Sequence, residues 1–320
     1  SAGGRAYQRW GLLTTLQLEK FEDNIVLPHE RTLTGPKEDR LRLIRACRTN
    51  LSPIFGFVDA PLGLDELASD AISIADFEDD KGVQQRIWKI TDPKVLQQLE
   101  ERMAAQQVFI ADGHHRYETA LGYRDERRAE APGEGAQDFD FLLCHLCSTR
   151  DAGLAVLPTH RIPKTAPQLE TFVDRCKTLC SITEMKDGQA LWQALDAPQE
   201  GERQPRLGAL LPDGRALLLE PGEGARKELA AIAPELAILD VTFLHNVLMP
   251  EIPNDQFIYT HDETETIDAV NSGKAEIAIL LPPPSVEDVL SISRAALTMP
   301  QKSTYFYPKV PSGIAYNPID

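Results

Sequence analysis

The sequence predicts an α/β fold, a mixed sheet with flanking helices. Short apolar runs that suit buried strands alternate along the chain with segments whose apolar residues recur every three or four positions. Gly and Pro mark many of the boundaries between them. With 320 residues, of which 42% are hydrophobic and 26% charged, the chain is long enough for about two domains with sizeable cores.

Residues 1–162 are expected to form one α/β domain. Its apolar runs predict strands, and Pro36 and Pro93 suit the first positions of helices. The acidic segment 60–80 is predicted to be a helix and a loop. The predicted strands are 11–19, 50–58, 86–90, 108–111 and 139–147.

The remainder is expected to divide in two. Residues 163–235 predict an accessory α+β subdomain, with helices at 169–179 and 190–195 and a hairpin whose turn is Pro212-Asp213-Gly214. Residues 236–320 predict a C-terminal α/β segment that packs on the first domain. Its expected elements are helices at 240–248 and 263–271, strands at 257–260 and 275–281, and a helix from 286.

The turn at 112–116 is the strongest functional signal. The apolar run 108–111 stops at Asp112-Gly113, and Tyr117, Ala120 and Leu121 then recur at the spacing of one helix face. A strand, a tight turn and a helix N-terminus are therefore expected. Unpaired backbone N–H groups and the positive end of the helix dipole favour an anion there, with phosphate the obvious candidate.

Composition excludes several classes of function. The net charge of −16 disfavours binding to nucleic acid, and no apolar run approaches the roughly 20 residues of a membrane helix. The first residues lack a basic segment followed by an apolar one, so a cytoplasmic location is expected. Cys144, Cys147, Cys176 and Cys180 lack the turn residues of a zinc knuckle and are predicted to be buried thiols.

Six ordered motifs resemble the bacterial and archaeal domain-of-unknown-function family numbered 1015, over nearly the whole chain. That family name implies no activity. The resemblance also implies a further N-terminal segment of about a domain's size, which is expected to be absent here. The motifs are Leu-Pro-His-Glu-Arg-Thr at 27–32, Gly-Pro-Lys-Glu-Asp-Arg-Leu at 35–41, Asn-Leu-Ser-Pro-Ile-Phe-Gly at 50–56, Ala-Asp-Gly-His-His-Arg-Tyr-Glu-Thr-Ala at 111–120, Leu-Pro-Thr-His-Arg at 157–161, and Met-Pro-Gln-Lys-Ser-Thr-Tyr-Phe-Tyr-Pro-Lys at 299–309.

The sequence Asp112-Gly-His-His-Arg116 is also similar to the phosphate-binding turn of the ParB and sulfiredoxin-like superfamily, which includes free-serine kinases. This second resemblance implies a phosphotransferase that acts on a small hydroxyl metabolite, with serine and phosphoserine as the leading acceptor pair. ATP or ADP, together with Mg²⁺, is the implied cofactor. A phosphorylated small molecule is thus the expected partner, and the oligomeric state stays open.

Phosphoryl transfer to an alcohol needs a phosphate cradle, a base, and cations over the transferred group. Sequence-distant polar segments are expected to meet in one cleft for this purpose, although 302–304 can equally be a polar loop and 160–161 a strand end. The predicted cradle is Gly113, His114, His115 and Arg116; the candidate catalytic carboxylates are Glu30, preferred as the base, Glu38 and Asp112; and the supporting groups are Lys37, Arg40, Arg161, Lys302, Ser303 and Thr304.

Two alternatives remain at this point. A metal-dependent phosphohydrolase would join Asp112 and one of His114 or His115 to His29, Glu30 or His160. Successive residues of a helix point about 100° apart, so His114 and His115 are not expected to bind the same ion together. A non-catalytic nucleotide- or anion-binding protein would use the same cradle without a base.

Overall fold

The computed structural model describes residues 7–32, 34–68, 71–80, 82–130, 133, 135–165, 169–199 and 201–320. The chain forms two compact units. Unit 1 comprises residues 1–155 and 306–320, and unit 2 comprises residues 156–305. The chain passes from one unit to the other in β9 (Ala155–Leu157) and in β16 (Tyr305–Tyr307).

Unit 1 is built on a mixed sheet in the order β1-β8-β4-β7-β2. The β2–β7 and β4–β8 pairs are parallel, whereas β1–β8 and β4–β7 are antiparallel. The strands of unit 1 are β1 (Leu12–Gln17), β2 (Val26–Leu27), β3 (Thr49–Asn50), β4 (Ile54–Val58), β5 (Ile72–Glu78), β6 (Gln84–Lys89), β7 (Val108–Asp112), β8 (Phe141–Ser148) and β17 (Asn317–Pro318). Its helices are α1 (Thr34–Cys47), α2 (Leu64–Leu67), α3 (Pro93–Met103) and α4 (His114–Glu130), with 3₁₀ turns η1 (Phe21–Asp23) and η3 (Asp138–Asp140).

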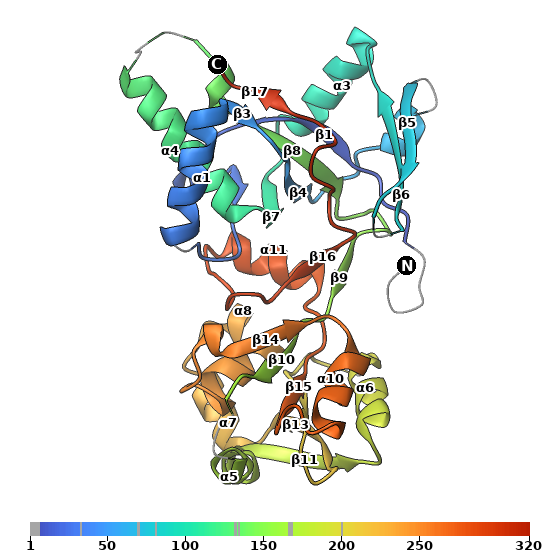
Figure 1. The fold of residues 1–320 in the computed structure, drawn as a ribbon, viewed down its shortest axis with the longest axis vertical. Helices are drawn as coiled ribbons and strands as arrows, with labels where there is room; N and C mark the ends of the chain where they lie inside the picture. The colour runs from blue at the N-terminus through green and yellow to red at the C-terminus, as the bar shows by residue number, and fades with distance from the viewer. Residues whose placement is uncertain are drawn as a thin grey trace. The chain divides into compact units, whose positions relative to one another are not determined.

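Both faces of the unit 1 sheet are covered by apolar side chains. On one face, Leu99 of α3 and Tyr117 and Ala120 of α4 pack against strand residues such as Ile54 and Ile110. On the other face, aromatic rings from β4 and β7 stack, and Phe306 lies against them. Helices α1 and α4 lie side by side (Figure 1). The sheet and its helices thus hold the turn between β7 and α4 rigidly.

Unit 2 is built on a sheet in the order β11-β13-β12-β15-β10-β14. Helices α6 and α10 pack together on one face (Figure 1), and α5, α7 and η4 pack on the other. The strands are β10 (His160–Pro163), β11 (Cys180–Met185), β12 (Leu207–Leu210), β13 (Ala216–Pro221), β14 (Phe257–Thr260) and β15 (Ala278–Leu280). The helices are α5 (Leu169–Leu179), α6 (Gly188–Asp196), α7 (Glu223–Leu229), α8 (Pro234–Ala237), α9 (Asp240–Thr242), α10 (Glu263–Asn271) and α11 (Val286–Arg294), with the π-helical turn η4 (Phe243–Leu248) and the 3₁₀ turn η5 (Asn254–Gln256).

The predicted α/β class is confirmed, but the expected three-part division differs from the structure. The hairpin β12–β13 of the middle segment shares one sheet with β14 and β15 of the last third. Strand β15 pairs with both β12 and β10, which joins residues 163–235 and 236–305 into one unit. These pairings are non-local, so local periodicity does not reveal them.

The acidic segment 60–80 also differs from its prediction. It contains the short helix α2 but also the strand β5, which forms an antiparallel hairpin with β6. The strand leaves Ile72, Ile74 and Phe77 more than one-third exposed. The acidic composition concealed the apolar alternation Ile72-Ser73-Ile74 that is typical of a strand. Among the described helices, none is both long and apolar enough to span a membrane.

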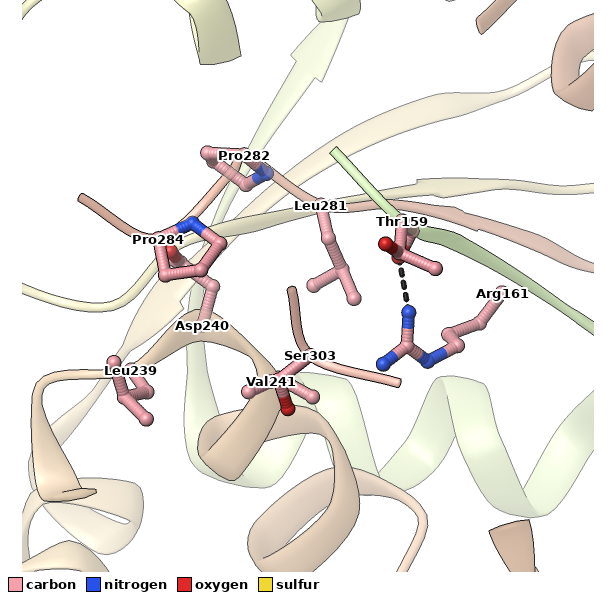
Figure 2. Close-up of a pocket in the computed structure, with 9 residues that line it drawn as sticks. All are labelled: Thr159, Arg161, Leu239, Asp240, Val241, Leu281, Pro282, Pro284 and Ser303. Carbon is pink, nitrogen blue, oxygen red and sulfur yellow. Dashed lines mark hydrogen bonds between the residues drawn. The ribbon is translucent and has the colours of Figure 1, made fainter. Parts of the chain in front are cut away.

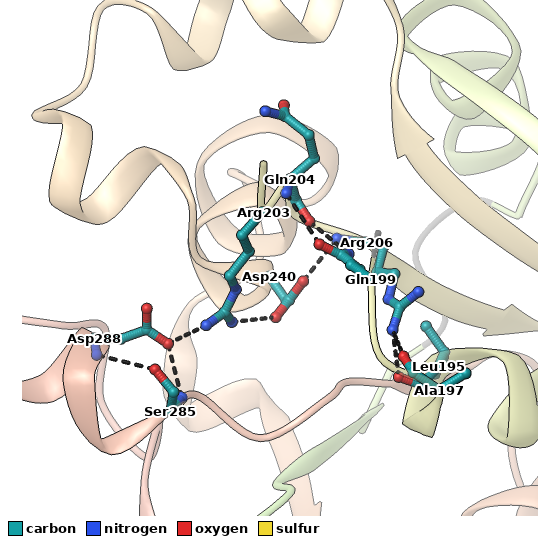
Figure 3. Close-up of polar contacts among 9 residues, drawn as sticks. All are labelled: Leu195, Ala197, Gln199, Arg203, Gln204, Arg206, Asp240, Ser285 and Asp288. Atoms are coloured by element: carbon teal, nitrogen blue, oxygen red, sulfur yellow. Dashed lines mark hydrogen bonds and ion pairs between the residues drawn. The ribbon is translucent and has the colours of Figure 1, made fainter. Parts of the chain in front are cut away.

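A buried ion network links distant segments of unit 2. Arg203 donates to Asp240 over 3.1 Å and to Asp288, and both carboxylates are less than one-tenth exposed (Figure 3). Asp288 also caps α11 together with Ser285. Burial raises the pKa of Asp240 to about 6, despite the opposing effect of the hydrogen bonds that it accepts. One guanidinium therefore compensates two buried carboxylates.

We expect Arg203→Ala to lower the free energy of unfolding by roughly 2–4 kcal/mol, because it leaves both carboxylates buried without their cation. The folded-state pKa of Asp240 is already raised, so its contribution to stability is lost as pH rises through about 6. The loss caused by the substitution should therefore be larger at pH 7.5 than at pH 5. Urea unfolding at both values measures it.

The matched control is Arg215→Ala, because the Arg215–Asp213 pair is 39% and 51% exposed. It should change stability by at most about 0.5 kcal/mol. Equal effects of the two substitutions, or no dependence of the Arg203→Ala effect on pH, would contradict the role assigned to the network.

Candidate functional site

The parallel pair β2–β7 brings two predicted segments to one edge of the sheet. Val26 pairs with Val108 and Leu27 with Phe109, so the carboxyl ends of both strands point the same way. Residues 28–30 follow β2, and the turn at Gly113 follows β7. The backbone N–H of His29 donates to Nε2 of His114 over 3.3 Å. The segments around Glu30 and Gly113 are therefore neighbours.

Glycine is required at position 113 for two reasons. Its φ is +100°, a backbone conformation that side-chain-bearing residues rarely adopt. A Cβ there would also lie 2.9 Å from Cγ2 of Ile54 and 3.0 Å from both Nε and Nη2 of Arg116. The backbone N–H of Tyr117 donates to the carbonyl of Gly113 over 3.0 Å, which makes Gly113 the cap of α4. The missing side chain leaves the space into which Arg116 folds.

Arg116 lies against the turn, and some of its guanidinium N–H groups make hydrogen bonds within the protein. Nη2 donates to Oδ2 of Asp112 over 3.0 Å, and Nη1 donates to Oγ of Ser52 over 3.1 Å and to the carbonyl of Pro53. Nε–H makes no hydrogen bond to the described residues, and Nε and Nη2 form the edge that faces Gly113. Burial lowers the pKa of Arg116, and nearby Arg40 lowers it further, while Asp112 opposes both.

Asp112 lies between two cations. Its Oδ2 accepts from Arg116, and its Oδ1 accepts from Nζ of Lys309 over 2.9 Å. The carboxylate of Asp112 thus holds two cations beside the turn. The analysis of sequence alone did not single out Lys309, although it lies at the end of the quoted motif 299–309. The two residues are 197 positions apart in the sequence, so no local sequence pattern indicates their contact.

Lys37 and Glu118 form a second polar pair near the turn. Nζ of Lys37 contacts Oε2 of Glu118, and Oγ1 of Thr32 donates to Oε1 over 2.8 Å. The sequence predicted a phosphoryl group as the partner of Lys37 and missed Glu118, although the quoted motif 111–120 contains it. The side chain of Lys37 is still 35% exposed. The contacts bring the beginning of α1 to the first turns of α4.

The side chains of His29 and His114 are buried and neutral. Nδ1 of His29 bonds to the carbonyl of Ile110 over 2.8 Å, and the ring lies edge-on to that of His114. Burial lowers the pKa of His29 to about 4 and that of His114 well below its ordinary value. The imidazole of His114 is therefore a core group, and the cradle role predicted for this residue is restricted to its backbone N–H.

The other predicted groups of unit 1 occupy different places. Glu30 lies half-buried at the sheet edge, and His115 is half-buried in the first turn of α4. Glu38 and Arg40 are exposed on α1. Among the described residues, no group of three or more His, Cys, Asp or Glu side chains is arranged to hold a metal ion. Cys144, Cys147 and Cys176 are buried free thiols, as predicted, and Cys180 is partly buried.

Arg161 and residues 302–304 belong to unit 2. Arg161 is fully buried: it donates to the carbonyls of Thr159 and Lys302, and its guanidinium carbon lies 4.7 Å from the centre of the Tyr259 ring. It lines a pocket with Asp240 and Ser303 (Figure 2), which has room of about 10 Å³, enough for one water molecule. These contacts fix the loop of Lys302, whose φ is +59°. The meeting of this loop with the turn of unit 1 stays a prediction.

The chain is similar to several known proteins. The sequence profile of a family described as "Protein of unknown function (DUF1015)" matches residues 1–242. No curated protein matches the sequence.

Similar solved structures include a conserved hypothetical protein from Pyrococcus furiosus. It is 14% identical with a TM-score of 0.44, and the alignment covers 94% of this chain and 93% of that one. A free serine kinase in complex with AMP is 12% identical with a TM-score of 0.46, with coverages of 96% and 91%. SbnI from Staphylococcus aureus is 11% identical with a TM-score of 0.44, with coverages of 92% and 82%.

The neutral histidines at the turn make stability depend on pH. The folded-state pKa of His29 is depressed to about 4, so its contribution is fully present above about 6.5 and is lost as pH falls towards 4. The free energy of unfolding should therefore fall on acidification. In His29→Asn the side-chain amide can still donate to the carbonyl of Ile110 but cannot titrate. The free energy of unfolding of this variant should therefore fall less on acidification than that of the wild type. The difference between the two proteins should reach up to about 1.4 kcal/mol per pH unit.

Urea unfolding of the wild type and of His29→Asn between pH 7.5 and pH 4.5 measures this difference. The buried histidines away from this contact contribute equally to both proteins, whereas the pKa of His114, which His29 helps to lower, rises in the variant and adds to the difference in the same direction. Parallel pH profiles would show that His29 is not neutral in the folded protein.

Proposed function

Because this chain belongs to the family of proteins of unknown function DUF1015, whose description assigns no activity, we propose a function from its site: unit 1 is a nucleotide-binding phosphotransferase that acts on a small hydroxyl metabolite. The ligand phosphate binds at the Gly113 turn. Glu30 serves as the base for the hydroxyl that is phosphorylated. The leading acceptor pair, serine and phosphoserine, rests on the resemblance of the turn Asp112–Arg116 to that of free-serine kinases.

The observation that carries the proposal is the edge of Arg116 that faces Gly113. Nε–H makes no hydrogen bond to the described residues, and it lies against Gly113, directly before the N-terminus of α4. The backbone N–H groups of residues 114–116 precede the first hydrogen bond within α4. A phosphate at the turn would thus meet a guanidinium edge and the positive end of a helix dipole.

The charges around the turn suit a phosphoryl group in transfer. Arg116 and Lys309 flank the carboxylate of Asp112, Arg40 lies on the neighbouring helix, and Lys37 of that helix pairs with Glu118. Positioned cations stabilise the charge on the oxygens of the transferred group. In a chain of net charge −16, cations gathered beside one turn suit the binding of an anion.

Glu30 is the preferred base because it follows β2, the parallel neighbour of β7. A hydroxyl substrate between the two strand ends could reach both a carboxylate and the bound phosphate. Glu38 is exposed on α1 and is the weaker candidate. General base catalysis needs the carboxylate within hydrogen-bond reach of the proton that it accepts.

A magnesium ion that arrives with a nucleotide needs few protein ligands, commonly one or two carboxylates, because phosphate oxygens and water complete its shell. Asp112 would supply such a carboxylate at this sheet edge only in exchange for a contact with Arg116 or Lys309, because both of its oxygens accept hydrogen bonds from these residues. When bound, Mg²⁺ would neutralise charge on the phosphates. A phosphohydrolase with a protein-held metal is less well supported, since the described residues contain no ligand group of three.

The test is Glu30→Gln, which preserves the shape of the side chain and removes the base. Transfer of phosphate between ADP or ATP and serine or phosphoserine should slow by roughly two to four powers of ten, while nucleotide affinity changes little. Glu38→Gln is the matched control and should retain activity. Measured turnover and calorimetric binding separate the two effects. Full activity of Glu30→Gln would refute the assignment of the base.

Arg116→Ala tests the phosphate site itself. It should weaken nucleotide binding by about 1–3 kcal/mol, the scale of charge-assisted hydrogen bonds. Arg45→Ala is the control, because Arg45 is exposed on α1 and pairs with Glu126 instead. If nucleotides bind, Arg116→Ala weakens them and no turnover is found with any acceptor, the protein is a non-catalytic nucleotide-binding protein. Unchanged nucleotide affinity in Arg116→Ala would refute the proposed site.

A further inference from the structure

A pocket lies beside Arg116 in unit 1, between α1, the segment before β4, α4 and β8. It has room of about 80 Å³, enough for several water molecules. Leu43 and Ile44 of α1, Leu51 and Leu142 of β8 form its apolar walls. Arg40 and Arg116 are the charged residues that line it.

Two of the four apolar wall residues, Leu43 and Leu51, are open to solvent. Leu43 is 49% exposed and Leu51 is 38% exposed, although both are large apolar side chains. A flat apolar group that covered them would remove this surface from water, which is favourable. A ligand that buried these side chains would therefore gain binding free energy from the apolar surface removed from water.

The polar side chains of the lining are largely engaged within the protein. Oγ1 of Thr119 donates to the carbonyl of His115 over 2.6 Å. Oδ1 of Asn50 accepts from the backbone N–H of Leu143 and from Nδ2 of Asn317. Oγ of Ser52 accepts from Arg116. The ligand group that fits is thus mainly apolar, with few hydrogen-bond requirements towards these walls.

The charge of the pocket indicates what the apolar group is attached to. Among the described residues that line it, two are arginines and none is acidic, in a chain with 49 acidic and 33 basic residues. Arg40 lies close enough to Arg116 to disfavour its protonated form. An anion beside both would relieve this repulsion.

We infer that this pocket is the subsite for the base of a nucleotide, whose phosphate lies on the Gly113 side of Arg116. Arg116 is the wall shared by the pocket and the turn: Nη1 holds Ser52 and Pro53 on the pocket side, and the Nε edge faces Gly113. A heteroaromatic base provides the flat apolar group, and the phosphate provides the anion. The inference rests on the proposed phosphate site and adds the location of the base.

Binding of AMP and of ribose 5-phosphate to the full chain tests the inference, because the two ligands share the phosphate and the sugar and differ in the base. Isothermal titration calorimetry of the wild type should give AMP an affinity at least about tenfold higher. Leu43→Gln and Leu51→Gln each place a polar amide on a partly exposed wall, where the fold tolerates it. Each should weaken AMP binding by about three- to tenfold and leave ribose 5-phosphate within about twofold.

Leu96→Gln is the matched control, since Leu96 is 42% exposed on α3 of the same unit and lies outside the pocket. It should leave both affinities unchanged. Equal wild-type affinities for AMP and ribose 5-phosphate, or unchanged AMP binding in both pocket variants, would overturn the base subsite while the phosphate site stands. Failure of every phosphorylated ligand to bind, inorganic phosphate included, would overturn both proposals.

Discussion

The structure of the candidate site depends on the contact between Arg116 and a residue that has no side chain. Position 113 must accept a φ of +100° and must leave free the volume that a Cβ would share with Arg116. Only then can the guanidinium fold back onto Asp112 and the segment before β4. From this contact follow the direction of α4, the position of Asp112 between Arg116 and Lys309, and the donor edge beside the helix N-terminus.

Charge is distributed around this contact in a consistent way. The imidazoles of His29 and His114 lie in the core and are neutral, because burial penalises their charged forms more than any neighbour favours them. Arg116 and Lys309 are partly exposed, and both pair with the carboxylate of Asp112. The site thus separates residues that build the sheet edge from residues that can meet an anion, although all come from the same short motifs.

Local patterns predicted the local parts of this arrangement. The strand β7, the turn and α4 were predictable because the change from a buried run to a helical period occurs within a few residues, with glycine between them. The partners Lys309 and Glu118 were not predictable, since contacts across 197 and 81 positions depend on the fold and leave no periodic signal. For the same reason the insertion of β15 between β12 and β10 escaped prediction, and with it the union of the middle segment and the last third. The inward side chain of His114 shows the remaining limit, because a motif names residues and does not say which way each one points.

Arg116 finally connects recognition of an anion to the shape of its surroundings. A guanidinium is planar and offers donors along separate edges, so one edge can fix Ser52 and Pro53 while another meets a ligand. A lysine offers donors from a single point and could not serve both directions. Because Ser52 lines the same pocket as Arg40 and Leu51, an oxyanion that draws Arg116 towards the turn would also act on the pocket wall. Arg116 thus joins the turn at Asp112 to the wall of the neighbouring pocket through one side chain.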